Sequence, residues 1–119
     1  MIGALRGLLA AALVGVATSA GAHSLLLESV PAPGATLTAP PRELMLRFNN
    51  RIEKSLSRVR LVDLGGIDRP LVVTVGAGPP DRLTAALPSL GPGRWRVEWQ
   101  VLSTDGHVVS GRFDFTLTP

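Results

Sequence analysis

The chain of 119 residues has no cysteine and no tyrosine, and it has only two histidines, two methionines and two tryptophans. Without cysteine, no disulfide can stabilise the fold, so a small domain must depend on burial of its apolar side chains. The chain has twelve basic and nine acidic residues, and it has no lysine-rich cluster. We therefore expect neither a disulfide-rich scaffold nor a nucleic-acid partner.

Only one long hydrophobic run is present, and it lies at the amino terminus. Residues 1–22 combine a single positive charge, an apolar run of eleven residues and a small-residue ending in the A-x-A arrangement. These are the features of a secretory signal peptide, and eleven apolar residues are too few for a comfortable membrane anchor. We expect cleavage after Ala22, leaving an exported domain of residues 23–119 that begins with His23 and has no membrane span.

The remainder of the chain reads as short strands separated by proline and glycine. Polar and apolar residues alternate with a period of two, which indicates strands with one buried face. The segments predicted as strands are 24–30, 43–48, 57–63, 70–75, 82–87, 94–101 and 112–117. About seven strands at short intervals favour an all-β fold, a β-sandwich or small barrel. The only helical candidate is a turn within residues 51–56.

The aromatic residues are concentrated in two of these strands. Trp95 and Trp99 lie on one face of the strand 94–101, and Phe113 and Phe115 occupy the strand 112–117. Large aromatic side chains on one strand face bury much apolar area. We expect these two strands to carry much of the core.

The connection between the two aromatic strands holds the candidate site. It reads Ser103-Thr104-Asp105-Gly106-His107, and the only other histidine is His23. A histidine at the start of a chain offers its α-amino group and Nδ1, and a second imidazole with a carboxylate would complete three nitrogens and one oxygen. Such planar donors suit Cu(II) and, more weakly, Ni(II), whereas zinc prefers a tetrahedron. On an extended segment, Asp105 and His107 would point the same way, with Gly106 relieving crowding.

Each of these signals also has a plain structural interpretation. Asp-Gly is among the commonest turn dipeptides, so Asp105-Gly106-His107 alone fits an ordinary loop. A histidine after a signal peptide can equally be incidental. From spacing alone, a metal site and a plain loop both stay open.

The ordered set of motifs resembles the CopC-like family of periplasmic copper-resistance proteins. The resemblance covers nearly all of residues 23–119 and is much more specific than any one motif. It rests on His23 after the A-x-A site, Ser29–Gly34 (similar to S-x-P-A-x-G), Leu46–Asn49, Gly91–Trp99, Ser103–His107 and Gly111–Phe115.

The resemblance implies a Greek-key β-sandwich or barrel of cupredoxin-like or immunoglobulin-like shape. It also implies one Cu(II) per chain, bound by His23 as an amino-terminal histidine brace together with Asp105 and His107. Some relatives have a glutamate near the copper, two residues after the strand-ending phenylalanine, where this chain has Asn50. Others have a methionine-rich stretch for Cu(I), but only Met45 remains here once Met1 is removed. Cu(I) selects soft sulfur ligands, so a cuprous site is not expected.

The function implied is non-enzymatic copper buffering, resistance or delivery in the periplasm. A monomer is expected, and a copper transporter of the inner membrane is a candidate partner. A small histidine-brace copper oxidase and a metal-free immunoglobulin-like interaction module are the two alternatives. A blue-copper site is excluded because its trigonal ligand set needs a cysteine.

Overall fold

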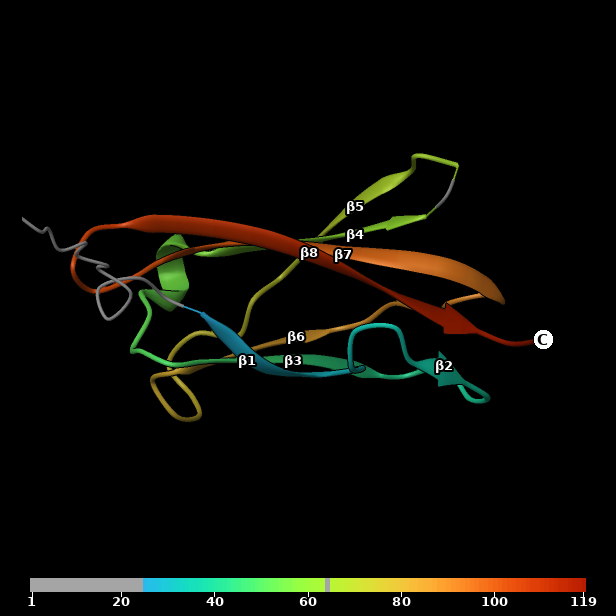
Figure 1. The fold of residues 1–119 in the computed structure, drawn as a ribbon, viewed down its shortest axis with the longest axis horizontal. Coiled ribbons are helices and arrows are strands. Elements are labelled where there is room, and N and C mark those ends of the chain that lie inside the picture. Colours follow the sequence, from blue (N-terminus) through green and yellow to red (C-terminus); the bar gives the residue numbers. More distant parts are fainter. Residues whose placement is uncertain (1–24, 64) are drawn as a thin grey trace, which may run out of the picture.

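The computed structural model describes residues 25–63 and 65–119 and forms two packed β-sheets. The expected signal peptide (residues 1–22), His23 and Ser24 lie outside the described residues. Figure 1 shows the sheets as two layers, with β8, β7, β4 and β5 above β1, β3 and β6. The predicted all-β sandwich is confirmed.

The three-stranded sheet has the order β1-β3-β6 and is antiparallel throughout. Its strands are β1 (Leu26–Val30), β3 (Glu43–Phe48) and β6 (Arg82–Ala86). The five-stranded sheet has the order β2-β8-β7-β4-β5, in which the short β2 runs parallel to β8. Its strands are β2 (Thr36–Leu37), β4 (Arg58–Asp63), β5 (Asp68–Leu71), β7 (Gly93–Leu102) and β8 (Val108–Leu117). The chain therefore passes repeatedly from one sheet to the other.

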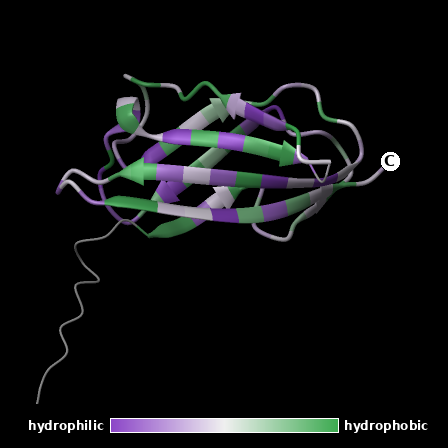
Figure 2. Cartoon of the chain, turned by 90° about the horizontal axis from the view of Figure 1, so that it is seen from above, coloured by the Kyte–Doolittle hydropathy of each residue, from purple (hydrophilic) through white to green (hydrophobic). Residues whose placement is uncertain are grey.

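The core lies between the sheets and follows the predicted alternation. In β3, Leu44, Leu46 and Phe48 are at most 1% exposed, and in β7 the side chains of Trp95 and Trp99 are also buried. Figure 2 shows the same alternation as bands of hydrophobic and hydrophilic residues along the strands. Phe113 and Phe115 of β8 complete the aromatic core, as the sequence predicts.

The strand predicted over residues 70–75 is wrong in its bounds. Hydrogen bonding to β4 covers Asp68–Leu71, after which the chain leaves the five-stranded sheet. Val73 then makes an isolated bridge to Ala85 of β6, in the opposite sheet. β5 is an edge strand, where proline is tolerated because its missing N–H interrupts no ladder. The β-branched run therefore bridges two sheets instead of forming one strand.

The helical turn expected within residues 51–56 is a single 3₁₀ turn, η2 (Lys54–Leu56). It links the sheets between β3 and β4. The two-residue β2 was not predicted, because two residues are too few to show a periodicity.

Gly111 is a position where the core tolerates no side chain. It lies opposite Trp99 in the β7–β8 ladder, and a Cβ added there would lie 2.8 Å from Trp99 Cε2 and closer still to Cζ2. The Trp99 ring is itself fixed by an edge-to-face contact with Phe48, with ring centroids 5.2 Å apart. The indole therefore rests directly on the glycine backbone.

We expect Gly111→Ala to destabilise the fold, because the indole must move away from a closely packed position. Overpacking of this kind costs about 1–3 kcal/mol, which lowers the Tm of a domain of this size by roughly 5–20 °C. Thermal unfolding followed by circular dichroism measures the shift. Gly91→Ala is the matched control, since a Cβ at Gly91 meets nothing within 4 Å. Equal Tm values for the two variants would contradict the packing argument.

Candidate metal centre

The Ser103–His107 segment is a tight turn that joins β7 to β8. The Ser103 N–H donates to the His107 carbonyl at 2.9 Å, and the Gly106 N–H donates to the Ser103 carbonyl at 2.9 Å. Gly106 has a φ of +91°, a conformation that side-chain-bearing residues rarely adopt. The expectation of an extended Asp105–His107 segment is therefore wrong, because the backbone reverses direction at Gly106.

The turn nevertheless brings the two candidate ligands together. Asp105 Oδ1 lies 3.2 Å from His107 Nδ1, and it also accepts a hydrogen bond from the His107 backbone N–H at 3.3 Å. The side chains of Asp105 and His107 are 41% and 52% exposed, so an ion can reach both. Within residues 25–63 and 65–119, no group of three metal-ligating side chains forms.

Ser103 holds Asp105 in place, although the sequence did not single it out as a site residue. Its side chain is only 3% exposed, and its hydroxyl donates to the Asp105 carboxylate while accepting from the His107 N–H. The Ser103 hydrogen bond is the main reason why the pKa of Asp105 lies below its ordinary value, since it stabilises the ionised form. The carboxylate thus stays charged, as a metal ligand must, down to mildly acidic pH. A hydroxyl residue two positions before the aspartate in a turn was the available sequence signal.

We expect Ser103→Ala to raise the pKa of Asp105 toward its ordinary value and to weaken metal binding up to about 10-fold. The carboxylate loses both its charge stabilisation and its fixed orientation, and residues that orient a ligand typically contribute 10–100-fold. NMR titration of the Asp105 carboxyl measures the pKa. Thr104→Ala, an exposed position in the same turn, is the control and should leave the pKa unchanged. An unchanged pKa in Ser103→Ala would refute the positioning role.

The beginning of the described chain lies at the same end of the sandwich as this turn. Leu25 and Asn49 are joined by two hydrogen bonds, from the Leu25 N–H to Asn49 Oδ1 at 2.7 Å and from the Asn49 N–H to the Leu25 carbonyl at 3.0 Å. Three residues beyond Asn49, Ile52 forms a β-bridge with Ser103 itself. Figure 1 shows the start of β1 and the β7–β8 turn at one end, opposite the C-terminus.

His23 lies outside the described residues and precedes Leu25 by two positions in the sequence. Asn50, at the position where the resemblance implies a glutamate in some relatives, is half-buried at this same end of β3. The described residues nearest to His23 in the sequence thus lie at the same end of the sandwich as the Ser103–His107 turn.

The separation of the two donors fits one small ion. Nitrogen and oxygen ligands bind such ions at about 2.0–2.2 Å, so two adjacent ligands at right angles lie about 2.9 Å apart. The observed 3.2 Å between Asp105 Oδ1 and His107 Nδ1 is close to this value. The same distance also permits a hydrogen bond from Nδ1–H to the carboxylate, which would leave His107 Nε2 to face the metal.

Two solved structures are similar to this chain in fold. The crystal structure of CopC from Methylosinus trichosporium OB3b superposes with a TM-score of 0.74 at 33% identity, covering 82% of this chain and 95% of that chain. The crystal structure of PcoC, a methionine-rich copper resistance protein from Escherichia coli, gives a TM-score of 0.68 at 26% identity, covering 81% and 99%. These likenesses confirm the β-sandwich fold.

Among the described residues, no helix is long and apolar enough to cross a membrane.

Two relatives match over most of their length. Protein YobA of Escherichia coli K12 is 31% identical over 107 residues, which are 86% of this chain and 84% of the relative. Copper resistance protein C of Escherichia coli is 31% identical over 112 residues, which are 87% and 88%. The CopC domain matches residues 26–118, nearly all of the predicted mature chain. This chain therefore belongs to the CopC family.

Proposed function

We propose that this protein binds one Cu(II) ion per chain and serves copper buffering, resistance or delivery in the periplasm. The observation that carries the proposal is the 3.2 Å approach of Asp105 Oδ1 to His107 Nδ1 in a turn at the amino-terminal end of the sandwich. Two kinds of relative support it, since both a solved structure and a protein of similar length are named as copper resistance proteins.

The proposed donor set combines this pair with His23. The α-amino group and Nδ1 of His23 form a chelate ring, and His107 adds a third nitrogen with Asp105 as the oxygen donor or as the acceptor that orients His107. Nitrogen and oxygen donors in a planar arrangement favour Cu(II) over zinc. Binding must release the proton of the α-amino group, whose pKa is ordinarily about 7.7–8.0, so the exchange is easy near neutral pH.

The direct test of stoichiometry and processing is the intact mass of the exported protein, with and without copper. A protein that starts at His23 and gains the mass of one copper ion is the expected result. A protein that retains residues 1–22, or that gains no copper, would refute the proposal.

We expect the copper site to hold Cu(II) much more tightly than Cu(I). No cysteine is present, and beyond Met1 the only thioether is that of Met45. Met45 pairs with Val30 and Thr84 in the middle of the three-stranded sheet, so its sulfur is not at the turn. Reduction of the copper-loaded protein with ascorbate should therefore release the ion to a cuprous chelator.

The control for this prediction is Met45→Leu, which keeps the size and the apolar character of the side chain. It should release reduced copper as readily as the unaltered protein. Tight retention of Cu(I) against the chelator would contradict the assignment, and a loss of that retention in Met45→Leu would identify the thioether as the ligand.

The proposal is for a binding protein rather than for a copper oxidase. Asp105 and His107 lie at the exposed tip of a turn, and the large cavity of about 870 Å³ on the five-stranded sheet is lined by neither. Reductant-dependent peroxide production by the copper-loaded protein should not exceed that of free Cu(II); a rate well above it would favour the enzyme.

A further inference from the structure

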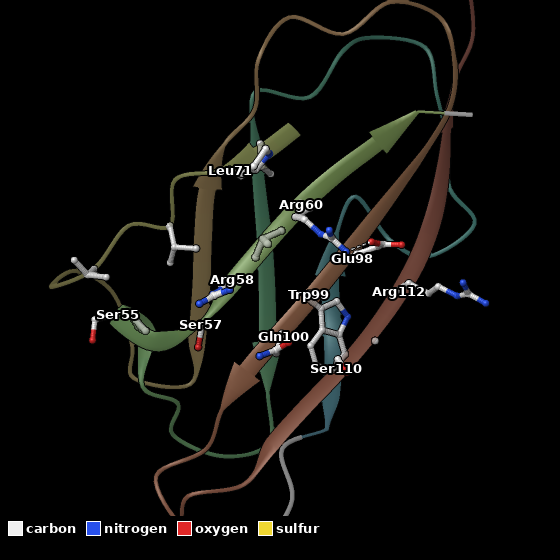
Figure 3. Close-up of a pocket in the computed structure, with 16 residues that line it drawn as sticks. Ser55, Ser57, Arg58, Arg60, Leu71, Glu98, Trp99, Gln100, Ser110 and Arg112 are labelled. Carbon is white, nitrogen blue, oxygen red and sulfur yellow. Dashed lines mark hydrogen bonds and ion pairs between the residues drawn. The ribbon is translucent and has the colours of Figure 1, made fainter. Parts of the chain in front are cut away.

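A second site of a different kind lies on the outer side of the five-stranded sheet. A cavity of about 870 Å³ is lined by residues of η2, β4, β5, β7 and β8 and by the segment that follows β5. Figure 3 shows its polar side chains along β4, β7 and β8. The cavity is far larger than a metal ion needs, and it falls within the range of roughly 300–1,000 Å³ that is usual for ligand sites.

The strand register arranges the polar lining in two rows. The first row runs across three strands as Arg58, Gln100 and Ser110, and the second runs as Arg60, Glu98 and Arg112. Their neighbours Val59, Val97 and Val101 are buried in the core. Because successive side chains alternate between the two faces of a strand, both rows point away from the core.

Some of the cations in this cavity already have partners. Arg60 binds Glu98 at 2.6 Å and Asp68 at 2.9 Å, as the dashed line to Glu98 in Figure 3 shows. The Lys54 ammonium donates to the Ala77 carbonyl at 2.7 Å. In the next row along β7, Arg96 is paired with Asp114 at 2.8 Å. The charges of Arg60 and Arg96 are thus neutralised by carboxylates of the protein, whereas the Lys54 ammonium is hydrogen-bonded to a neutral carbonyl and keeps its charge.

Arg58 and Arg112 remain, one at each side of the cavity. Within the described parts of the chain, neither guanidinium forms an ion pair or hydrogen bond. Gln100 lies on β7, between their two strands, and Ser110 precedes Arg112 by two residues on β8; both side chains offer neutral donors. Guanidinium groups match carboxylates in geometry and in charge, so the unpaired cations favour a carboxylate-bearing ligand.

Apolar residues also line the cavity. They are Leu71, Val73 and Val75, of which Leu71, the partner of the buried Val59, and Val73 pack against the edge of the core. The Lys54 hydrogen bond to Ala77 ties this segment to η2. Val75 is 53% exposed, and Leu56, between two residues that line the cavity, is 62% exposed. Exposed apolar side chains grouped beside unpaired cations indicate a ligand with apolar groups next to its carboxylates.

We propose that this cavity binds an acidic peptide segment of a partner protein, with carboxylate and apolar side chains close together in its sequence. Arg58 and Arg112 lie on strands separated by β7, about 10 Å apart across the sheet. A segment with several carboxylates can engage both cations, whereas one small anion cannot. Glu98 lies between the cations and disfavours a compact multivalent anion, and a hollow of this size suits a peptide better than a flat lipid surface.

The test uses the full mature protein and a fluorescent peptide of six to eight residues that alternates glutamate with valine. Fluorescence anisotropy at about 0.15 M salt measures its affinity. The double variant Arg58→Gln with Arg112→Gln should bind at least about 10-fold more weakly, a loss of about 1.4 kcal/mol. Arg42→Gln removes the same charge at an exposed position outside the cavity and should change the affinity less than twofold.

A variant that is expected to strengthen peptide binding shows that weaker binding in the other variants is not caused by loss of folding. Glu98→Gln removes the negative charge between the two cations and leaves Arg60 paired with Asp68, so it should strengthen peptide binding several-fold. Damage to the fold would weaken binding instead. The Cu(II) affinity should stay the same in all three variants, since the cavity and the metal centre share no residue.

Four results would overturn the proposal. The first is an equal loss in Arg42→Gln, which would show a general charge effect. The second is complete competition by a small dicarboxylate such as succinate at the peptide's own concentration, which would show a small-molecule site. The third is equally tight binding of a lysine–valine peptide. The fourth is binding to vesicles of anionic phospholipid, with the same dependence on Arg58, in preference to the peptide.

Discussion

His107→Ala is expected to lower the Cu(II) affinity of the mature protein by more than about 100-fold. The variant removes the proposed nitrogen donor outright, whereas the loss of a residue that merely orients a ligand already costs roughly 10–100-fold. Asp105→Ala is expected to follow with a loss of about 10–100-fold. It removes the oxygen donor and also the acceptor of the His107 backbone N–H, which lies 3.3 Å from Asp105 Oδ1. Competition with a Cu(II) chelator near pH 7 measures both affinities.

Two further variants sharpen this experiment. Thr104→Ala changes an exposed side chain in the same turn and should leave the affinity unchanged. Asp105→Asn keeps an oxygen in place but removes the charge. Its Cu(II) affinity should therefore lie between that of the unaltered protein and that of Asp105→Ala. Unchanged affinity in both His107→Ala and Asp105→Ala would remove these residues from the site, whatever the family relationship.

A single glycine or methionine placed before His23 is expected to lower the Cu(II) affinity by a factor on the order of 100. The added residue converts the α-amino group of His23 into an amide, so the chelate ring between that amine and Nδ1 is lost. An amide nitrogen gives up its proton far less readily than an ammonium whose pKa is about 7.7–8.0. The affinities of the extended and native forms are compared by the same chelator competition, and equal values would rule out the amino-terminal brace.

Cleavage after Ala20 instead of Ala22 predicts a different protein. The chain would begin Gly21-Ala22-His23, and this tripeptide can wrap Cu(II) with its amine, two deprotonated amides and the imidazole. Asp105 and His107 would then be unnecessary. Asp105→Ala can be made both in a protein that begins at Gly21 and in one that begins at His23. The substitution should weaken copper binding only in the protein that begins at His23.

The sequence alone was sufficient for the fold class and for most of the core. The strict alternation in Arg94–Val101 placed Trp95 and Trp99 on one face, and both are buried. Leu44, Leu46 and Phe48 followed the same rule in β3. A period of two is a local property of the extended backbone, so it can be read without knowledge of the tertiary structure. The resemblance to the family was likewise visible in the order of the motifs, because the order of residues is a property of the sequence itself.

Only the tertiary structure determined features that depend on which segments become neighbours. The β-branched residues after Pro70 looked like one strand, but hydrogen bonds to β4 end at Leu71 and Val73 bridges to Ala85. The local sequence pattern cannot show which of the two sheets a segment will hydrogen-bond to, because both sheets offer backbone partners. The unpaired Arg58 and Arg112 belong to the same class of feature, since only the register of β4, β7 and β8 shows which arginines have acidic partners.

The candidate metal centre lies between these two cases. The sequence identified Asp105 and His107 from their residue types and spacing, and the structure places them 3.2 Å apart. The reason, however, is the turn at Gly106 and the buried Ser103 hydroxyl rather than an extended strand. Residue chemistry is fixed by the sequence, whereas the approach of two donors depends on backbone dihedral angles and on buried hydrogen bonds, which form only when β7 and β8 pair in the folded sheet.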